Sequence, residues 1–249
     1  MIEIRKARKQ FGTQVVFENL DLTINKGESV FVIGKSGTGK SVLLKSIVGL
    51  LKLDAGEVWL DGNEISALPE DKLHPVRKKC GYLFQQPALL DSLTIYENLA
   101  FGLRAHRICE TEEGVGQRIR TVLDAVHVGD EWLNCFPPEL SFGLQKRVSV
   151  ARALSVDPEY LLFDEPTTGL DPVLTRLITE MISELSKSGR VTSVVVSHDL
   201  QCAFRAADRI VLLDNGGVTL DVTPLKFQAS THPLAQAFVR EAKERMYVE

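Results

Sequence analysis

The sequence predicts an α/β fold in which a parallel sheet covered by helices is joined to an antiparallel β subdomain and a helical subdomain. Apolar runs of strand length alternate with helical patterns in the second half of the chain, and this alternation is typical of a parallel sheet. Residues 1–60 instead place one strand-like run after another, with turn residues between them, which favours antiparallel pairing.

The N-terminal runs IEIRKA, LDLTI and EVWLDG are expected to form the antiparallel sheet, around one core strand with the sequence ESVFVIG. Residues from about 88 to 156 show mostly helical spacing of apolar side chains, as in TIYENLAFGLR and GQRIRTVLDAV, and form the predicted helical subdomain. No internal repeat or Gly/Ser linker interrupts the chain, so residues 1–249 are treated as one domain.

In the second half, YLLFDE, VTSVVVSHD and DRIVLLD are the predicted strands of the parallel sheet. A helix is expected after the first of them, because Asp171 before Pro172 is a favoured helix start. DNGGV predicts a hairpin turn after the last strand. Residues 232–249 have the amphipathic pattern of a helix, which is expected to cap the core rather than to dock a partner.

The composition is that of an ordinary globular protein, with 44% hydrophobic and 25% charged residues among 249. A formal net charge of -4 argues against nucleic acid as the main partner, because phosphate binding favours a basic surface. The N-terminus lacks the apolar segment of a signal peptide, and the apolar runs are too short to span a membrane. A soluble protein is predicted, which reaches a membrane only by docking. Neither a metal site nor a disulfide framework is predicted from the scattered cysteines, which are Cys80, Cys109, Cys135 and Cys202.

A glycine-rich segment, GKSGTGKS, follows the apolar strand SVFVI and opens the helical pattern SVLLKSIVGLL. Strand, loop and helix in this order are the context that a phosphate-binding loop requires, and its glycines let backbone N–H groups turn inward around oxyanions. Lys40 is expected to contact the β- and γ-phosphates, and the Ser41 hydroxyl to bind Mg²⁺. The residues predicted to hold a nucleoside triphosphate are Gly34, Lys35, Ser36, Gly37, Thr38, Gly39, Lys40 and Ser41.

Polar residues also follow other predicted strands. YLLFDE places Asp164 and Glu165 at a strand end, where ligands bind in open α/β sheets. Asp164 suits a Mg²⁺ ligand, and Glu165 suits the group that polarises the attacking water. His198, after SVVVS, either contacts a γ-phosphate oxygen or that water, or is a solvated or capping residue. Gln85, after CGYLF, is either a further site residue or a surface polar residue.

The stretch LSFGLQKR, residues 140–147, predicts a second anion-binding element. Apolar residues recur at helical spacing after Ser141, which is a favoured N-cap, and Pro137 and Pro138 end any earlier helix. The orphan N–H groups and the positive dipole end of a helix start together attract anions.

Taken in order, the phosphate loop, the Gln after a strand, the Ser-led helix, FDE, GLD and the His after a strand resemble the ATPase subunit of ATP-binding cassette (ABC) transporters. The resemblance covers nearly the whole chain. It implies a P-loop NTPase (RecA-like) core, a nucleotide-binding domain over residues 1–249, and ATP with Mg²⁺ as cofactors. It also implies a head-to-tail homodimer that closes on ATP and drives an integral-membrane permease.

Within that resemblance LSFGLQKR aligns with the LSGGQ motif, so Ser141 and the N–H of Gly143 are expected to contact the γ-phosphate of ATP held mainly by the other copy. Gln85 would contact Mg²⁺ or water and relay to the permease. Asp171 would lie in the loop that contacts the other copy. Phe11, in KQFGTQVVF, would stack on adenine, a contact worth roughly 1–3 kcal/mol per base; the alternative is that Phe11 packs beneath the sheet.

Two residues depart from the LSGGQ pattern: Phe142 stands at a Gly position and Leu144 at the Gln position. A bulky residue fits after the cap if its side chain points away and its φ is negative. An active ATPase with altered dimer contacts is expected; the alternative is a degenerate half-site.

A finer resemblance, in LLDSLTIYENLAFGLR, QKRVSVARAL, DEPTTGLDPV and VTSVVVSHDLQCAFRAADRIVLL, is to ATPases of Mla-type (Mce-linked) phospholipid transporters. In that branch the fifth LSGGQ residue is typically Met, for which Leu144 is a close apolar substitute. It implies an Mce-domain lipid-binding protein and sometimes a STAS-domain subunit, with the chain cytoplasmic and peripheral on the inner face of the inner membrane. An importer ATPase for amino acids or other small polar solutes is the alternative, because its motifs overlap heavily.

Other classes of protein fit less well. A soluble ABC-type ATPase of DNA repair or translation needs a second ATPase domain or long coiled-coil insertions. A small-molecule P-loop kinase would not need Ser141 or His198 at these positions. The basic run KLHPVRKK, residues 72–79, either meets lipid headgroups or forms a solvated helical face.

Overall fold

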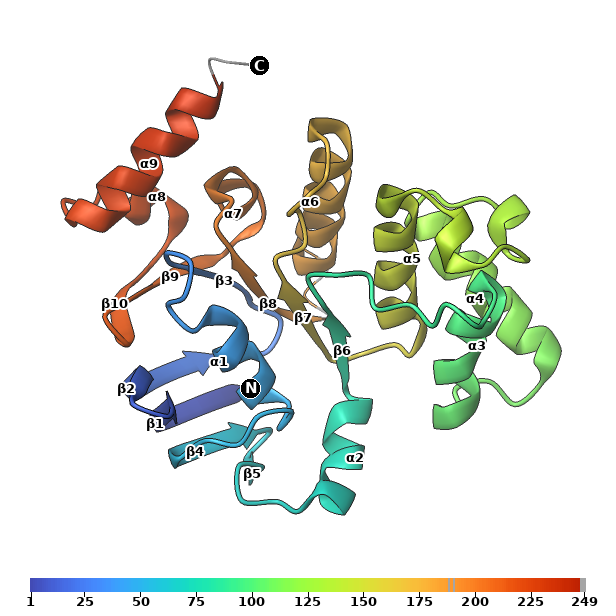
Figure 1. Cartoon of the computed structure of the whole chain (residues 1–249), viewed down its shortest axis with the longest axis horizontal. Helices are drawn as coiled ribbons and strands as arrows, with labels where there is room; N and C mark the ends of the chain where they lie inside the picture. The colour runs from blue at the N-terminus through green and yellow to red at the C-terminus, as the bar shows by residue number, and fades with distance from the viewer. Residues whose placement is uncertain (188, 190, 247–249) are drawn as a thin grey trace.

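The computed structural model describes residues 1–187, 189 and 191–246 and is built on two sheets (Figure 1). A six-stranded sheet has the strand order β10-β9-β3-β8-β7-β6, and a four-stranded sheet has the order β2-β1-β4-β5. The predicted α/β class, with a parallel core sheet and an antiparallel N-terminal sheet, is confirmed.

The antiparallel sheet consists of β1 (Ile2–Phe11), β2 (Gln14–Ile24), β4 (Ala55–Leu60) and β5 (Asn63–Glu64). The first two strands form a hairpin in which Phe11 pairs with Gln14, and Gly12 turns the chain with a φ of 56°. Glycine suits this turn because a positive φ costs it little. The predicted run IEIRKA is therefore only the first part of a longer strand.

The core sheet contains β3 (Ser29–Ile33), β6 (Cys80–Leu83), β7 (Tyr160–Asp164), β8 (Thr192–Ser197) and β9 (Arg209–Asp214), all parallel. The predicted hairpin turn leads to β10 (Gly217–Val222), which is antiparallel to β9. Ile33 pairs with Ser197, and Asp164 pairs with Val196. The carboxyl ends of β3, β7 and β8 consequently lie at one edge, where open α/β sheets bind ligands.

Helices cover the core sheet and extend beyond β6, where α3, α4 and α5 gather to one side of the molecule (Figure 1). Within the described residues no helix has both the length and the apolar composition needed to cross a membrane. The helices are α1 (Lys40–Ile47), α2 (Glu70–Lys78), α3 (Ile95–His106), α4 (Glu112–Ala125), α5 (Phe142–Ser155), α6 (Pro172–Lys187), α7 (Leu200–Ala206), α8 (Pro224–Gln228) and α9 (Pro233–Met246), with 3₁₀ turns η1 (Asp130–Trp132) and η2 (Pro137–Glu139).

Strand β3 is buried on both faces and divides the interior in two. Phe31 and Ile33 point into a core shared with α3 to α7, whereas Val30 and Val32 point into a core shared with α1 and the antiparallel sheet. Successive strand residues face opposite sides, so a continuous apolar run is what a doubly covered strand requires. The prediction of one core strand in this part of the chain is confirmed.

The C-terminal helix α9 covers the core, as predicted. Ala235 and Ala242 are buried in the core shared with α7, and the Gln201 amide donates to the Ala242 carbonyl at 2.9 Å. Residues 247–249, the end of the predicted helix, lie outside the described residues.

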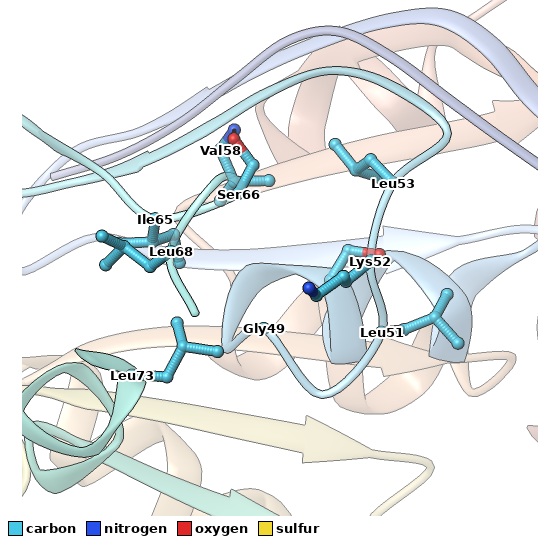
Figure 2. Close-up of a pocket in the computed structure, with 10 residues that line it drawn as sticks. Gly49, Leu51, Lys52, Leu53, Val58, Ile65, Ser66, Leu68 and Leu73 are labelled. Atoms are coloured by element: carbon cyan, nitrogen blue, oxygen red, sulfur yellow. Dashed lines mark hydrogen bonds between the residues drawn. The ribbon is translucent and has the colours of Figure 1, made fainter. Parts of the chain in front are cut away.

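Helix α2 presents the basic run to solvent, with Lys72, His74 and Lys78 exposed. A small hollow lies between α2, the turn after α1 and the antiparallel sheet, lined by Gly49 and Leu73 among others (Figure 2). Its volume of about 10 Å³ is enough for about one water molecule and too small for a nucleotide. The basic run is thus an exposed helical face, which both alternatives for it require.

The Asp61 carboxylate joins the N-terminus to both sheets. Burial raises the pKa of this carboxyl, but the hydrogen bonds that it accepts lower it more, so its pKa lies well below the usual range. Its donors are the Tyr160 hydroxyl at 2.6 Å, Lys79 Nζ at 3.0 Å, the Met1 amine at 3.0 Å and Lys26 Nζ at 3.1 Å.

Replacing Asp61 with Asn is expected to lower the free energy of unfolding at pH 7 by about 2 kcal/mol, because charge-assisted hydrogen bonds are lost. Asn tolerates the φ of 52° at this position, so the charge is the main change. A carboxyl with a depressed folded pKa stabilises above its unfolded pKa of about 3.9 and loses that effect as the pH falls further. Urea unfolding of Asp61→Asn and of the exposed control Asp91→Asn should therefore differ at pH 7, and the difference should shrink as the pH falls from about 3.9 toward the depressed folded pKa of Asp61; equal stability at pH 7 would contradict the assignment.

Candidate functional site

The glycine-rich loop between β3 and α1 has the backbone shape that its sequence predicts. Gly37 and Gly39 have φ angles of 81° and 89°, which side chains other than glycine rarely allow. A Cβ on Gly39 would lie 2.4 Å from Val16 Cγ1, so the β1–β2 hairpin packs directly against the loop. Residues 35–37 are exposed, which leaves their N–H groups open to a ligand from solvent.

The Lys40 side chain lies beneath this loop and is only 7% exposed. Its ammonium donates to the carbonyls of Gly34 at 2.7 Å and Lys35 at 3.0 Å, and lies 4.0 Å from Glu165 Oε1. Burial lowers the pKa of Lys40, and attraction to Glu165 and Asp164 only partly opposes this effect. A buried cation held in place by carbonyls fits the phosphate chain of a nucleotide.

Ser41 and Asp164 meet at the edge of the sheet, as the sequence predicts for a magnesium site. The Ser41 hydroxyl donates to Asp164 Oδ1 at 2.6 Å, and the Tyr82 hydroxyl donates to Asp164 Oδ2 at 3.3 Å. Mg²⁺ prefers hard oxygen ligands and usually takes one or two from a protein, the others coming from water and phosphate. A hydroxyl and a carboxylate in contact beside a phosphate loop therefore fit that ion.

Glu165 and His198 form a second pair at the same edge. His198 Nδ1 and Glu165 Oε2 lie 2.8 Å apart, and Thr168 Oγ1 donates to the same oxygen at 3.2 Å. Burial raises the pKa of Glu165, but the His198 hydrogen bond and the Lys40 charge outweigh it, so the pKa is lowered. The carboxylate is thus ionised and able to accept a proton or a hydrogen bond. Glu165 also has a φ of 50°, and such unfavourable backbone angles cluster at functional sites.

Phe11 lies at the end of β1 with 49% of its surface exposed, and Lys9 Nζ lies 5.3 Å from the centre of its ring. The alternative prediction, that Phe11 packs beneath the sheet, is therefore wrong. The same hairpin packs on the phosphate loop through Val16, and the exposed Phe11 ring lies at its turn.

Ser141 starts α5, as predicted, and its hydroxyl accepts a hydrogen bond from Leu144 N at 3.4 Å. The serine is exposed. Helix α5 lies to the side of the core, beyond α6 and β6 when viewed from α1 (Figure 1). The structure thus joins Lys40, Ser41, Asp164 and the Glu165 pair in one place and leaves Ser141 in another.

The start of α5 packs on the start of α6. Asp171 caps α6 by accepting from Leu174 N at 2.9 Å. A Cβ on buried Gly143 would lie 2.3 Å from Leu174 Cδ1, and one on Gly169 would lie 3.4 Å from Phe142 Cε1. Glycine at 143 therefore has a packing reason within the chain, in addition to the predicted approach of a phosphate.

Gln85 lies just after β6 and is exposed, and its backbone carbonyl accepts a hydrogen bond from Lys146 Nζ at 2.5 Å. Lys146 is fully buried, and burial lowers its pKa to about 8 although attraction to Asp164 and Glu165 opposes the shift. Lys146 is not among the residues that the sequence motifs predict for the site. The sequence does contain one indication of its burial. Lys146 lies three residues from both Gly143 and Ser149 on α5, so it shares a helix face with these two buried residues.

A groove of about 720 Å³ opens beside this site. Its lining comes from residues 167–179, at the start of α6, and from residues 198–205, along α7, and includes His198. The lining of the groove does not include the glycine-rich loop, whose residues 35–37 are exposed on the surface above the buried Lys40.

Comparison with known proteins places this geometry in a family. A family model described as ABC transporter matches residues 17–168. The chain is 39% identical over 227 residues to a methionine import ATP-binding protein, MetN, of Carboxydothermus hydrogenoformans, covering 89% of this chain and 65% of that protein. It is 37% identical over 212 residues to a probable ribonucleotide transport ATP-binding protein, mkl, of Mycobacterium bovis, covering 85% and 58%. The chain therefore spans less than two thirds of these relatives.

Solved structures match over a larger share of their length. A dimeric structure of the ATP-binding cassette MJ0796, in a post-hydrolysis state with ADP and Pi, superposes with a TM-score of 0.84 at 33% identity. The match covers 90% of this chain and 99% of that one. cbiO1 from Clostridium perfringens, part of an ABC transporter complex, has a TM-score of 0.81 at 25% identity and covers 96% and 94%.

Proposed function

We propose that this chain, which belongs to the ABC transporter family as an ATPase cassette with ATP and Mg²⁺ as its cofactors, powers a membrane transporter. The observation that carries the proposal is the direct contact, at one sheet edge, of a buried lysine, a hydroxyl–carboxylate pair and a histidine-bound glutamate. The residues in contact are Lys40, Ser41, Asp164, Glu165 and His198.

Each of these residues has a task in hydrolysis that its geometry supports. Lys40 binds the β- and γ-phosphate oxygens. These oxygens replace the Glu165 carboxylate, which lies 4.0 Å from the Lys40 ammonium in the structure. Ser41 and Asp164 hold Mg²⁺, which neutralises the phosphate charge. Glu165 accepts a hydrogen bond from the attacking water and orients it, while His198 fixes the carboxylate through Nδ1.

Ser141, Gly143 and Asp171 act on the ATP of a second copy. Their two helix starts pack together, because a Cβ on Gly143 would meet Leu174. A nucleotide on the exposed loop would be open to solvent on one side. A helix start from a second copy can close that side, because helix N-termini bind phosphate oxygens. ATP then favours the closed dimer because γ-phosphate contacts from both copies exist only in that state. Closing and opening of the dimer drives the permease between two conformations.

Replacing Ser141 with Ala is expected to leave ATP affinity of the isolated monomer within about twofold, while lowering hydrolysis by at least about tenfold, because the serine contacts the partner's nucleotide. Loss of the N-cap should also lower the free energy of unfolding by about 1 kcal/mol. Thr111→Ala is the matched control, since Thr111 caps α4 by accepting from Gly114 N at 3.1 Å. Fluorescent-ATP titration and a steady-state ATPase assay separate the two effects; equal weakening of monomer binding would rule out the trans assignment.

The transported molecule is proposed to be a small polar solute taken up through a separate permease. Two kinds of relative support this choice: a methionine import protein at 39% identity and a probable ribonucleotide transport protein at 37%. The named relatives support the importer alternative better than the phospholipid prediction, and none of those named carries an Mce or STAS assignment.

Phospholipid transport is a second candidate for the function, and a single residue supports it. Leu144 occupies the motif position where Mla-type ATPases resembling this chain typically have Met, and its side chain packs against the core cluster. An apolar residue here fits that branch, whereas a polar Gln is the pattern of the wider family.

Co-purification separates the candidates. The tagged Glu165→Gln chain, which retains ATP, is purified from detergent-solubilised membranes of its own organism, and its partners are identified by mass spectrometry. A multi-spanning permease with a solute-binding protein supports import, and ATP-dependent uptake of radiolabelled amino acid into reconstituted vesicles completes the test. Recovery of an Mce-domain protein would replace import with lipid transport. Absence of any membrane partner would overturn both.

A further inference from the structure

Lys146 is a buried cation that bonds to backbone instead of to an acidic side chain. Its Nζ donates to two successive carbonyls, of Phe84 at 3.3 Å and of Gln85 at 2.5 Å. The lysine is 0% exposed. Burying an ammonium group is costly unless it is hydrogen-bonded, so these two carbonyls are what makes the position tolerable for lysine.

Two more donors of α5 bond to the same segment. Ser149 Oγ donates to the Pro87 carbonyl, and Arg152 Nη1 donates to the Ala88 carbonyl at 2.9 Å. Lys146, Ser149 and Arg152 are spaced three residues apart, so they line one face of the helix, here called the donor face. The donor face thus holds residues 84–88, here called the Gln85 segment, along nearly two turns of α5.

The donor face connects two parts of the predicted site. Lys146 lies five residues after Ser141, or roughly 7.5 Å along the helix axis. A helix of this length is stiff, so any displacement of the Gln85 segment reaches the Ser141 end of α5. The Gln85 side chain itself is exposed and depends on its backbone for its position.

We infer that Lys146 is a positioning residue for ATP hydrolysis: its two hydrogen bonds fix the Gln85 segment to α5, so that Gln85 and the Ser141 end of α5 move together. The inference rests on the proposed function, because the roles of Gln85 and Ser141 belong to it. In this role Lys146 is a positioning residue and not a catalytic one, because it acts on the reaction through the backbone of Gln85.

A double-mutant cycle tests this role in the full chain, with its permease where one co-purifies. Gln85→Ala removes the side chain to be positioned but keeps the backbone carbonyl that Lys146 binds. Lys146→Met removes the donor and keeps a long apolar side chain. Lys146→Met is expected to lower kcat about tenfold, the usual lower bound for loss of a supporting hydrogen bond. In the Gln85→Ala background the same change should lower kcat less than about twofold.

Two further measurements complete the test. KM for ATP should stay within about twofold in Lys146→Met, because the glycine-rich loop is untouched. Lys146→Arg, which keeps a donor, should recover at least half of the activity. Lys226→Met makes the same substitution at an exposed lysine of α8 and should match the wild type. If Lys146→Met loses its thermal unfolding transition, Arg152→Met at the half-buried end of the donor face replaces it in the same cycle.

An equal loss of kcat in both backgrounds, or no loss in either, would overturn the inference. Failure of the proposed function has a different signature. In that case the wild-type chain with its permease does not hydrolyse ATP, or Lys40→Ala is as active as the wild type.

Discussion

Replacing Glu165 with Gln is expected to lower kcat for ATP hydrolysis by about 10²- to 10⁴-fold, the range for loss of a group that takes part in proton transfer. Gln keeps the size of the side chain and can still accept a hydrogen bond from Thr168 or His198, which lie 3.2 and 2.8 Å from Oε2. It lacks the charge that polarises water. ATP binding should therefore remain, and size-exclusion chromatography with Mg²⁺ and ATP should show accumulated dimer.

Glu159→Gln is the matched control for this variant. Glu159 directly precedes β7 at the opposite edge of the sheet from Glu165 and is half exposed. The same change there should leave kcat within about twofold. Hydrolysis by Glu165→Gln at more than about a tenth of the wild-type rate would assign the general base to another residue.

Replacing Lys40 with Ala is expected to weaken ATP binding by about 30- to 4,000-fold and to abolish measurable hydrolysis. Truncating a buried, hydrogen-bonded charge costs about 2–5 kcal/mol, and each 1.4 kcal/mol is about tenfold in affinity. The loss should be large because Lys40 is buried and already fixed by two carbonyls, so little freedom is lost when phosphate arrives.

Titration calorimetry with a non-hydrolysable ATP analogue measures this effect. Lys52→Ala removes an exposed lysine that follows α1 and should bind as the wild type does. Unaltered affinity in Lys40→Ala would mean that the nucleotide is held by the backbone loop alone.

The sequence predicted most of the features that depend on neighbouring residues. The phosphate loop was identified from a strand, a run of glycines and a helix in immediate succession. The placement of Asp164, Glu165 and His198 at one edge followed from the rule that parallel strands end together, and the pairing of Asp164 with Val196 and of Ser197 with Ile33 confirms it. Their roles, and that of Ser141, stay predictions.

Features that depend on distant segments were not predicted. The position of Lys146 in its helix pattern does not distinguish a buried from an exposed lysine. The carbonyls that make its burial possible belong to residues 84 and 85, which are 62 and 61 positions away in the sequence. The Asp61 network has the same origin, because Tyr160 is 99 positions away. For Phe11 the sequence left two environments open, since exposure at a hairpin end depends on what covers it.

The Mla-type prediction shows a different limit. The four stretches that carry it overlap heavily with those of importer ATPases, so they discriminate transport substrates poorly. Leu144 was a single further residue that fitted the Mla branch. The names of the relatives instead refer to methionine import and to probable ribonucleotide transport.

The packing of the Phe142 ring beside Gly169, and of Gly143 on Leu174, has a pharmacological consequence. The two segments that are proposed to face a second copy lie against each other through an aromatic ring that is 37% exposed. A compound that displaces this ring would move both segments at once, without entering the chain's own glycine-rich loop. Cassettes that have glycine at the position of Phe142 lack this ring. An inhibitor that binds the ring would therefore be selective for proteins that carry an aromatic residue there.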